Sequence, residues 1–157
     1  MPFAHIAGTI GFPFLSQWGV AGLVSRGAEM RASRSLIREF GVKTRGPFDA
    51  LTALSGGNQQ KVVLARWHAE PARLLLLDEP FQGVDIGARN DIIRAIRAKS
   101  KDRATVVFVN DLEEALEVAD RVVVMEDRSI AGDGDGALAE AAAPLASTGP
   151  AISYALS

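Results

Sequence analysis

Cysteine is absent from this sequence of 157 residues, which excludes disulfide bonds and metal sites built on thiolates. A strong net charge is also lacking, because 17 lysines and arginines are set against 19 aspartates and glutamates. Bulk electrostatics therefore give no reason to expect nucleic-acid binding. The sequence contains no internal repeat. Its 48% hydrophobic and 23% charged residues are typical of one globular domain with a core.

Charged side chains are unevenly distributed along the chain. None occurs in residues 4–24, a stretch long enough for a membrane span to be considered. Pro13, four glycines and Gln17 interrupt this stretch, and no basic residue precedes it as in a secretion signal. We expect an irregular segment that is buried or faces a partner. Residues 1–61 carry an excess of basic side chains and residues 62–157 an excess of acidic ones, which suggests different partners.

Hydrophobic periodicity and capping residues predict helices that alternate with strands. The expected helices are 26–40, 55–69, 85–100 and 112–119, and the expected strands are 74–77, 105–109 and 121–125. Ser25 and Asp85 are placed to cap helices, and the continuous apolar run 74–77 predicts a strand buried on both faces. A turn is expected at 132–136, followed by a poorly ordered tail. The alternation implies an α/β fold with a parallel sheet.

The second expected helix begins within residues 54–61, which read Leu-Ser-Gly-Gly-Asn-Gln-Gln-Lys. Gly56 and Gly57 at a helix start let the backbone approach an anion closely, and the free N–H groups and the positive end of the helix dipole face that anion. Ser55 adds a hydroxyl donor. The alternative is a plain serine cap with glycines for a tight turn, and a bare Ser-Gly-Gly favours this alternative.

Two carboxylates follow the first expected strand, in residues 74–80, which read Leu-Leu-Leu-Leu-Asp-Glu-Pro. Ligands bind at the carboxyl ends of strands in open α/β sheets. Asp78 is placed to hold Mg²⁺, and Glu79 to polarise an attacking water as a general base. An Asp-Glu-Pro turn after a core strand explains the pattern equally well. The loop Gly83-Val84-Asp85 that follows either contacts a second subunit or simply caps a helix.

The order and spacing of these three motifs resemble the signature motif, Walker B motif and D-loop of ABC-type ATPases. Residues 58–61, together with Arg66-Trp67, 83–89 and 119–122, resemble the C-terminal ATP-binding domain of importers for ribose and other monosaccharides. The resemblance spans about residues 14–132. It implies a partial P-loop NTPase fold, an α/β domain with a parallel sheet, flanking helices and part of the α-helical subdomain.

The resemblance also implies a site shared by two ATP-binding domains that face each other head to tail. The residues expected to bind the nucleotide are Ser55, Gly56, Gly57, Asn58, Asp85 and Asn110. Of these, the signature residues would contact ATP held by the partner domain, and Asp85 would communicate between the two sites. Asp78 would hold Mg²⁺ and Glu79 would be the catalytic base, both serving ATP on their own polypeptide.

The cofactors implied by the resemblance are ATP and Mg²⁺, and the implied partners are a second ABC ATPase domain and membrane permease subunits. A periplasmic or extracellular sugar-binding protein would take part indirectly, and no nucleic acid is expected. The implied location is peripheral, on the cytoplasmic face of the inner membrane. Residues 1–53 would belong to the α-helical subdomain and its lead-in, 54–132 to the ATPase core and 133–157 to the tail.

The sequence departs from the family pattern at three places. It contains no Gly-x-x-x-x-Gly-Lys-Ser/Thr loop to hold the phosphates of ATP, and no glutamine-bearing loop is identifiable. Asn110 stands where many members have a histidine, and asparagine can donate a hydrogen bond but cannot take a proton. Phe81 stands in the D-loop where a small hydroxyl residue is usual, which would alter how two domains meet.

Three interpretations follow from these departures. In the first, the chain is part of the ATPase subunit of a sugar importer and has no ATPase activity by itself. In the second, it is a non-catalytic module that lends its signature helix to an intact ATPase. The third, an ABC ATPase of DNA repair or translation, is disfavoured by residues 58–61 and by the acidic C-terminal part. An uncovered sheet edge and core face would make the isolated chain marginally stable or prone to aggregation.

Overall fold

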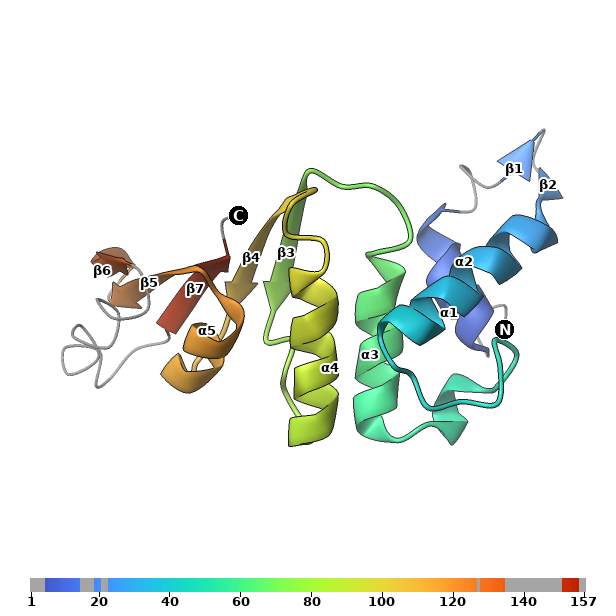
Figure 1. Ribbon diagram of the computed structural model, residues 1–157, viewed down its shortest axis with the longest axis horizontal. Coiled ribbons are helices and arrows are strands. Elements are labelled where there is room, and N and C mark those ends of the chain that lie inside the picture. The colour runs from blue at the N-terminus through green and yellow to red at the C-terminus, as the bar shows by residue number, and fades with distance from the viewer. Residues whose placement is uncertain (1–4, 15–18, 21–22, 127, 135–150, 156–157) are drawn as a thin grey trace. The chain divides into compact units, whose positions relative to one another are not determined.

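The computed structural model describes residues 5–14, 19–20, 23–126, 128–134 and 151–155 (Figure 1). The chain forms two compact units, Met1–Pro71 with Gly83–Ala95, and Ala72–Gln82 with Ile96–Ser157. Each unit has buried hydrophobic residues of its own. Within the described ranges, no helix is long and apolar enough to cross a membrane.

The first unit is built mainly of helices. α1 (Ile6–Gly11) packs against α2 (Arg26–Glu39) and α3 (Gly56–Arg66), and most of α4 (Ile86–Arg97) belongs to the same unit. Its short elements are η1 (Phe12–Phe14), β1 (Gly19–Val20), β2 (Leu23–Val24) and η2 (Leu51–Ala53). Fully buried side chains from three helices form its core, namely Ile6, Ile10, Leu36 and Val62, with Phe40 just after α2.

The ends of these helices follow from local chemistry, as predicted. The Ser25 hydroxyl oxygen accepts a hydrogen bond from the Ala28 N–H at 3.3 Å and begins α2. α2 stops before Gly41, whose φ of +57° suits a residue without a side chain. The Asp85 carboxylate accepts from the Ala88 N–H at 2.8 Å and begins α4.

The second unit is a five-stranded sheet with the strand order β3-β4-β7-β5-β6 and one short helix. Its elements are β3 (Leu74–Asp78), β4 (Ala104–Phe108), α5 (Leu112–Val118), β5 (Arg121–Glu126), β6 (Ser129–Gly134) and β7 (Ala151–Ala155). β3 and β4 pair in parallel, with Asp78 opposite Phe108. β7 is antiparallel to both β4 and β5, and β6 is antiparallel to β5. The sheet is therefore mixed, although β4 and β5 run in the same direction.

The expectation that residues 74–77 are buried on both faces is wrong. Leu75 and Leu77 are buried, whereas Leu74 and Leu76 are 54% and 60% exposed. β3 alternates between faces as any strand does, and it is the edge strand of the described sheet, so Leu74 and Leu76 are exposed while Val106, which pairs with Leu76, is buried. Because residues 74–77 are all leucine, the sequence gives no sign of this alternation.

Three further expectations differ from the structure. A turn was expected at 132–136, and this is wrong for residues 132–134. They belong to β6, which continues to Gly134 and pairs with β5. No strand was expected in the tail, yet β7 lies there; residues 135–150 are outside the described residues. The charge-free segment was expected to be irregular, but it contains α1, which buries Ile6 and Ile10. The remaining predicted helices and strands are present, with ends that differ by a few residues.

Candidate functional site

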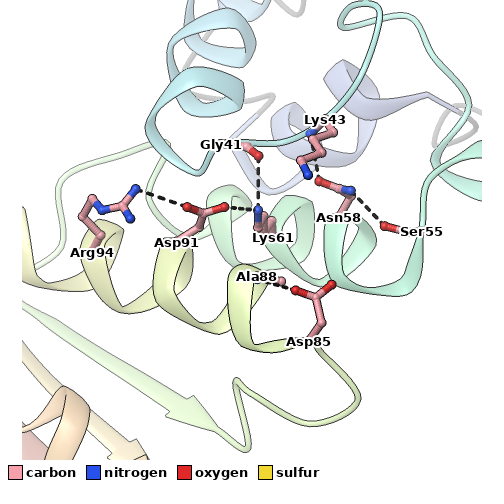
Figure 2. A network of polar contacts seen from close by, with 9 residues as sticks. All are labelled: Gly41, Lys43, Ser55, Asn58, Lys61, Asp85, Ala88, Asp91 and Arg94. Carbon is pink, nitrogen blue, oxygen red and sulfur yellow. Dashed lines mark hydrogen bonds and ion pairs between the residues drawn. The ribbon is translucent and has the colours of Figure 1, made fainter.

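The start of α3 carries the residues that the sequence singled out first. Ser55 precedes the helix, but its side chain accepts no capping hydrogen bond from the helix backbone. Its hydroxyl oxygen instead accepts a hydrogen bond from the side-chain amide of Asn58 at 2.8 Å (Figure 2). Ser55 and Gly56 are both exposed. The plain serine cap, one alternative from the sequence, is therefore not how this hydroxyl is used.

The two glycines of this motif have different reasons to be glycine. A Cβ on Gly57 would lie 3.0 Å from the Ala88 Cβ, so Gly57 allows α3 and α4 to approach closely. A Cβ on Gly56 would meet only the Gly83 carbonyl oxygen, at 4.0 Å. Packing within the chain therefore does not demand glycine at position 56. A glycine in open space at a helix start fits the close approach of a ligand to the backbone.

A cavity of about 380 Å³ lies beside the start of α3, within the first unit. The predicted residues that line it are Ser55, Gly57, Asn58 and Asp85. Three basic side chains, of Lys43, Lys61 and Arg94, line it as well. Hydroxyl, backbone and cationic groups around one cavity at a helix N-terminus make a site suited to an anion.

A buried ion pair joins the elements around this cavity. The Lys61 ammonium pairs with the Asp91 carboxylate and donates to the Gly41 carbonyl oxygen at 3.2 Å, and Arg94 donates to the other oxygen of Asp91, also at 3.2 Å (Figure 2). Only 3% of the Lys61 side chain is exposed. The hydrogen bond from Lys61 lowers the pKa of Asp91 more than burial raises it. One pair thus ties together the end of α2, the middle of α3 and α4.

Sequence reasoning gave Lys61 no role and missed Asp91. Lys61 follows Gly57 by four residues and precedes Ala65 by four, so it lies on the buried stripe of α3. Asp91 likewise lies between the buried residues Ala88 and Ala95 of α4. A charged residue of opposite sign on the apolar stripe of each helix was the available signal for a buried pair.

The carboxylates of the second motif lie in the second unit, at the carboxyl end of β3. Asp78 is the last residue of the strand and is exposed. Glu79 follows with φ +45°, a conformation uncommon for a residue with a side chain. Its N–H donates to the Phe108 carbonyl oxygen at 2.9 Å, which fixes the turn at the end of the sheet.

The structure brings Glu79 together with Asn110, 31 residues later in the chain. Asn110 follows β4, the neighbour of β3, and its side-chain amide donates a hydrogen bond to the Glu79 carboxylate. A carboxylate held by an amide donor keeps its lone pairs oriented, while the amide takes no proton. This contact gives Asn110 a definite place beside the candidate base.

The D-loop follows the second motif in the sequence. Phe81 is 3% exposed, so atoms of this chain cover its ring. Gly83 has φ +71°, which explains why glycine stands there. The two histidines have structural surroundings: His5 accepts from the Gly8 N–H at 2.9 Å at the start of α1, and His68 is buried with its ring edge against Phe40.

Comparisons with known proteins agree with these motifs. A family model described as ABC transporter matches residues 15–82. The ribose import ATP-binding protein RbsA 2 of Rubrobacter xylanophilus is 46% identical over 113 residues, which are 71% of this chain and 22% of that protein. The chain spans part of an ABC transporter ATP-binding domain. The arabinose import ATP-binding protein AraG of Shigella boydii is 42% identical over 112 residues, which are 71% of this chain and 22% of that protein.

Solved structures support the fold of this ATP-binding domain. The dimeric ATP-binding cassette MJ0796 in a post-hydrolysis state, bound to ADP and phosphate, has a TM-score of 0.72 over 87% of this chain and 58% of that one, at 19% identity. A second dimeric structure of the same cassette gives 0.73 with the same coverage. The partial ABC ATPase fold expected from the sequence is confirmed. Because the chain spans about a fifth of its curated relatives, the activity of a whole protein is a separate matter.

The residues present fit the ATP and Mg²⁺ that this family uses. The open backbone at Gly56 and the basic cavity wall suit a phosphate group. No group of three or more acidic or histidine side chains that could hold a metal occurs among the described residues. The Asp78 carboxylate at the carboxyl end of β3 is exposed and offers an oxygen ligand of the kind that Mg²⁺ takes.

Proposed function

We propose that this chain supplies the signature helix and the Walker B carboxylates of the ATP-binding subunit of a sugar importer. The observation that carries the proposal is the start of α3, where Ser55 lines a cavity together with Lys43 and Asn58 and the backbone at the neighbouring Gly56 is open. The identity of 46% and 42% to ribose and arabinose import proteins supports a sugar as the transported substrate.

The signature residues act on ATP that another ATP-binding domain holds. Ser55 donates a hydrogen bond and Gly56 and Gly57 offer backbone N–H groups to a phosphate oxygen, while Asn58 borders the same cavity. Asp85 caps α4 and lines the same cavity, within the first unit. Closure of such a surface over ATP, and its release after hydrolysis, converts chemical energy into movement of a permease.

The carboxylate end of β3 acts on ATP bound to the same polypeptide. Asp78 holds Mg²⁺, which neutralises charge on the phosphates when it is bound. Glu79 orients and deprotonates the attacking water, and Asn110 keeps the Glu79 carboxylate in place through its amide. Since Asn110 takes no proton, proton transfer falls to Glu79.

The proposed partners are a second ATP-binding domain and permease subunits, with a sugar-binding protein acting indirectly. The proposed location is the cytoplasmic face of the inner membrane, as a peripheral subunit. The basic excess of residues 1–61 supports a partner of its own for that part of the chain.

The test is association of the purified chain with an intact arabinose-importer ATP-binding protein, followed by sedimentation. We expect a complex in Mg-ATP, none in Mg-ADP, and a measurably weaker complex for Ser55→Ala in Mg-ATP. Asn90→Ser, at another residue that lines the cavity, serves as the matched control and retains the complex. If the wild-type chain fails to associate at any ATP concentration, the proposal is wrong.

A second candidate function is a non-catalytic module that lends only its signature helix. The sequence favours it because it contains no Gly-x-x-x-x-Gly-Lys-Ser/Thr loop. The two candidates differ in the effect of Glu79→Gln when the upstream part of an arabinose-importer ATP-binding domain, with its phosphate-binding loop, is fused to this chain. A loss of ATP turnover by the fusion supports the catalytic assignment, whereas unchanged turnover supports the module.

A further inference from the structure

Asn58 makes two side-chain hydrogen bonds that together fix how its amide is oriented. Its Oδ1 accepts from the Lys43 backbone N–H at 2.8 Å, and its Nδ2 donates to the Ser55 hydroxyl oxygen at 2.8 Å (Figure 2). A backbone N–H can only donate, so the oxygen of the amide has to face Lys43. The NH₂ group is thereby turned toward Ser55, and the orientation does not depend on how the two amide atoms are told apart.

This orientation decides the role of the Ser55 hydroxyl. A hydroxyl has one proton to donate and two lone pairs with which to accept. Because the Ser55 oxygen accepts from Asn58, the hydroxyl does not donate its own proton to Asn58. The Ser55 side chain also makes no capping hydrogen bond to the helix. The proton is left for an acceptor outside this pair. A phosphate oxygen is such an acceptor, and it cannot donate in return when it is ionised.

The Lys43 N–H belongs to a turn that the buried ion pair holds in place. The Lys61 ammonium donates to the Gly41 carbonyl oxygen at 3.2 Å, and the Val42 N–H donates to the Ile37 carbonyl oxygen at 2.9 Å. A Cβ on Gly41 would lie 3.2 Å from a carboxylate oxygen of Asp91, so the turn packs closely on the pair. The anchor of Asn58 is therefore a rigid part of the first unit.

We propose that Asn58 is a positioning residue that keeps the Ser55 hydroxyl in its donor state for a phosphate oxygen. The proposal rests on the function proposed above, and it assigns Asn58 an action through Ser55 rather than a contact with the nucleotide. The chain of contacts runs from Lys61 and Asp91 through the turn at Lys43 to Asn58, and from Asn58 to Ser55.

The substitution that separates these roles is Asn58→Asp. The aspartate keeps an oxygen for the Lys43 N–H, so the turn and the fold are retained. It has no proton for Ser55, so the hydroxyl now donates to the aspartate and turns a lone pair toward the phosphate. A lost charge-assisted hydrogen bond of this kind corresponds to about a tenfold to hundredfold weaker association with the intact ATPase in Mg-ATP.

Two comparisons separate positioning from the added charge. Asn90→Asp places the same charge on the wall of the same cavity without a contact to Ser55, and we expect it to weaken association less than Asn58→Asp. In a Ser55→Ala background the effect of Asn58→Asp should fall to that of Asn90→Asp, because no hydroxyl remains to be turned. Equal effects of Asn58→Asp with and without the Ser55 hydroxyl would overturn the positioning role.

A measurement on the chain alone tests the geometry without a partner. In ¹⁵N–¹H spectra, Ser55→Ala should shift one proton of the Asn58 side-chain amide, while the Lys43 N–H keeps its slow exchange with solvent. An unmoved Asn58 amide would overturn the proposal. If the wild-type chain does not associate with the ATPase in Mg-ATP, both this proposal and the proposed function fail. If the wild-type chain associates but the effects of Asn58→Asp and Ser55→Ala are additive, only the positioning role fails.

Discussion

The start of α3 and strand β3 differ in how their side chains are held. Around the start of α3, two sets of polar contacts, one of Asn58 with Lys43 and Ser55 and one of Lys61 with Gly41 and Asp91, meet at the turn 41–43 (Figure 2). In the sheet of the second unit, β3 keeps one apolar face exposed at Leu74 and Leu76. Side chains at the start of α3 are thus held by polar contacts within the first unit, whereas the exposed leucines of β3 are of the kind that proteins cover with a partner or a further segment.

This difference bears on the function proposed above for each unit. Ser55 is oriented by contacts within the first unit, so under that proposal it would act on a nucleotide that another molecule brings. At the carboxyl end of β3, Glu79 and Asn110 are in contact. Leu74 and Leu76 of the same strand remain exposed. We expect the isolated chain to aggregate through that face, and the signature surface to remain intact.

The largest expected effect separates the two faces of β3. Leu77→Ala removes a buried side chain and should lower the free energy of unfolding by about 3 kcal/mol. Leu76→Ala, on the exposed face of the same strand, should cost under about 1 kcal/mol and reduce aggregation. Urea denaturation followed by circular dichroism measures both. Equal costs for the two substitutions would mean that the exposed face is covered in solution.

The next largest effect concerns the buried ion pair of the first unit. Asp91→Asn leaves the buried Lys61 ammonium without its counter-charge and should lower the free energy of unfolding by about 2–3 kcal/mol at pH 7. The folded-state pKa of Asp91 is lowered, so the contribution of this carboxylate is present above about pH 4 and is lost as the pH falls through that pKa.

Denaturation of wild type and Asp91→Asn over a range of pH tests this assignment. The gap between the two proteins should be widest near neutrality and should narrow in acid. A gap that stays constant as the pH falls would show that the Asp91 charge is not the source of the stability difference.

The two signature glycines give a smaller and more specific contrast. Gly57→Ala brings a methyl group to 3.0 Å from the Ala88 Cβ and should destabilise the first unit by about 1–2 kcal/mol. Gly56→Ala meets open space, so stability should be unchanged while ATP-dependent association with the intact ATPase is weakened. Melting curves and sedimentation in Mg-ATP separate the two outcomes. If Gly56→Ala destabilises as much as Gly57→Ala, the glycine at position 56 serves packing.

The smallest effect is expected for the ion pair between β5 and β6. Arg121 and Asp133 pair at the surface, and the hydrogen bond from Arg121 lowers the pKa of Asp133. Both side chains are well exposed, so water and salt screen the pair. Asp133→Asn should therefore change stability much less than Asp91→Asn in the same assay. An equal loss would indicate that the β5–β6 hairpin depends on this pair.

The sequence predicted the elements that depend on local signals. Serine and aspartate caps, a positive-φ glycine and the apolar periodicity located the main helices, because these signals act within a few residues. Ser55, Gly56 and Gly57 lie at a helix start and Asp78 and Glu79 at the end of a strand, as predicted, and their roles toward ATP stay predictions. The contact between Asn110 and Glu79 followed the expected parallel pairing of their two strands.

The features that sequence reasoning missed depend on distant contacts. The pair of Lys61 with Asp91 joins residues on two helices, and its only local trace is a charge on each apolar stripe. β7 pairs with β4 and β5 across long separations in the sequence. It lies in a segment rich in Ala, Pro, Ser and Thr, a composition that predicted a poorly ordered tail. The exposed face of β3 could not be read from four successive leucines, since identical side chains carry no alternation.

Photocleavage with orthovanadate tests the central claim, that this signature helix closes over the terminal phosphate of a nucleotide held by another domain. Vanadate trapped with Mg²⁺ and ADP on the intact ATPase stands in for that phosphate, and ultraviolet light cuts the backbone at a serine in contact with it. The account predicts a cut at Ser55 of this chain, absent in Ser55→Ala and without nucleotide. A trapped complex in which this chain stays uncut, or is cut elsewhere, would contradict it.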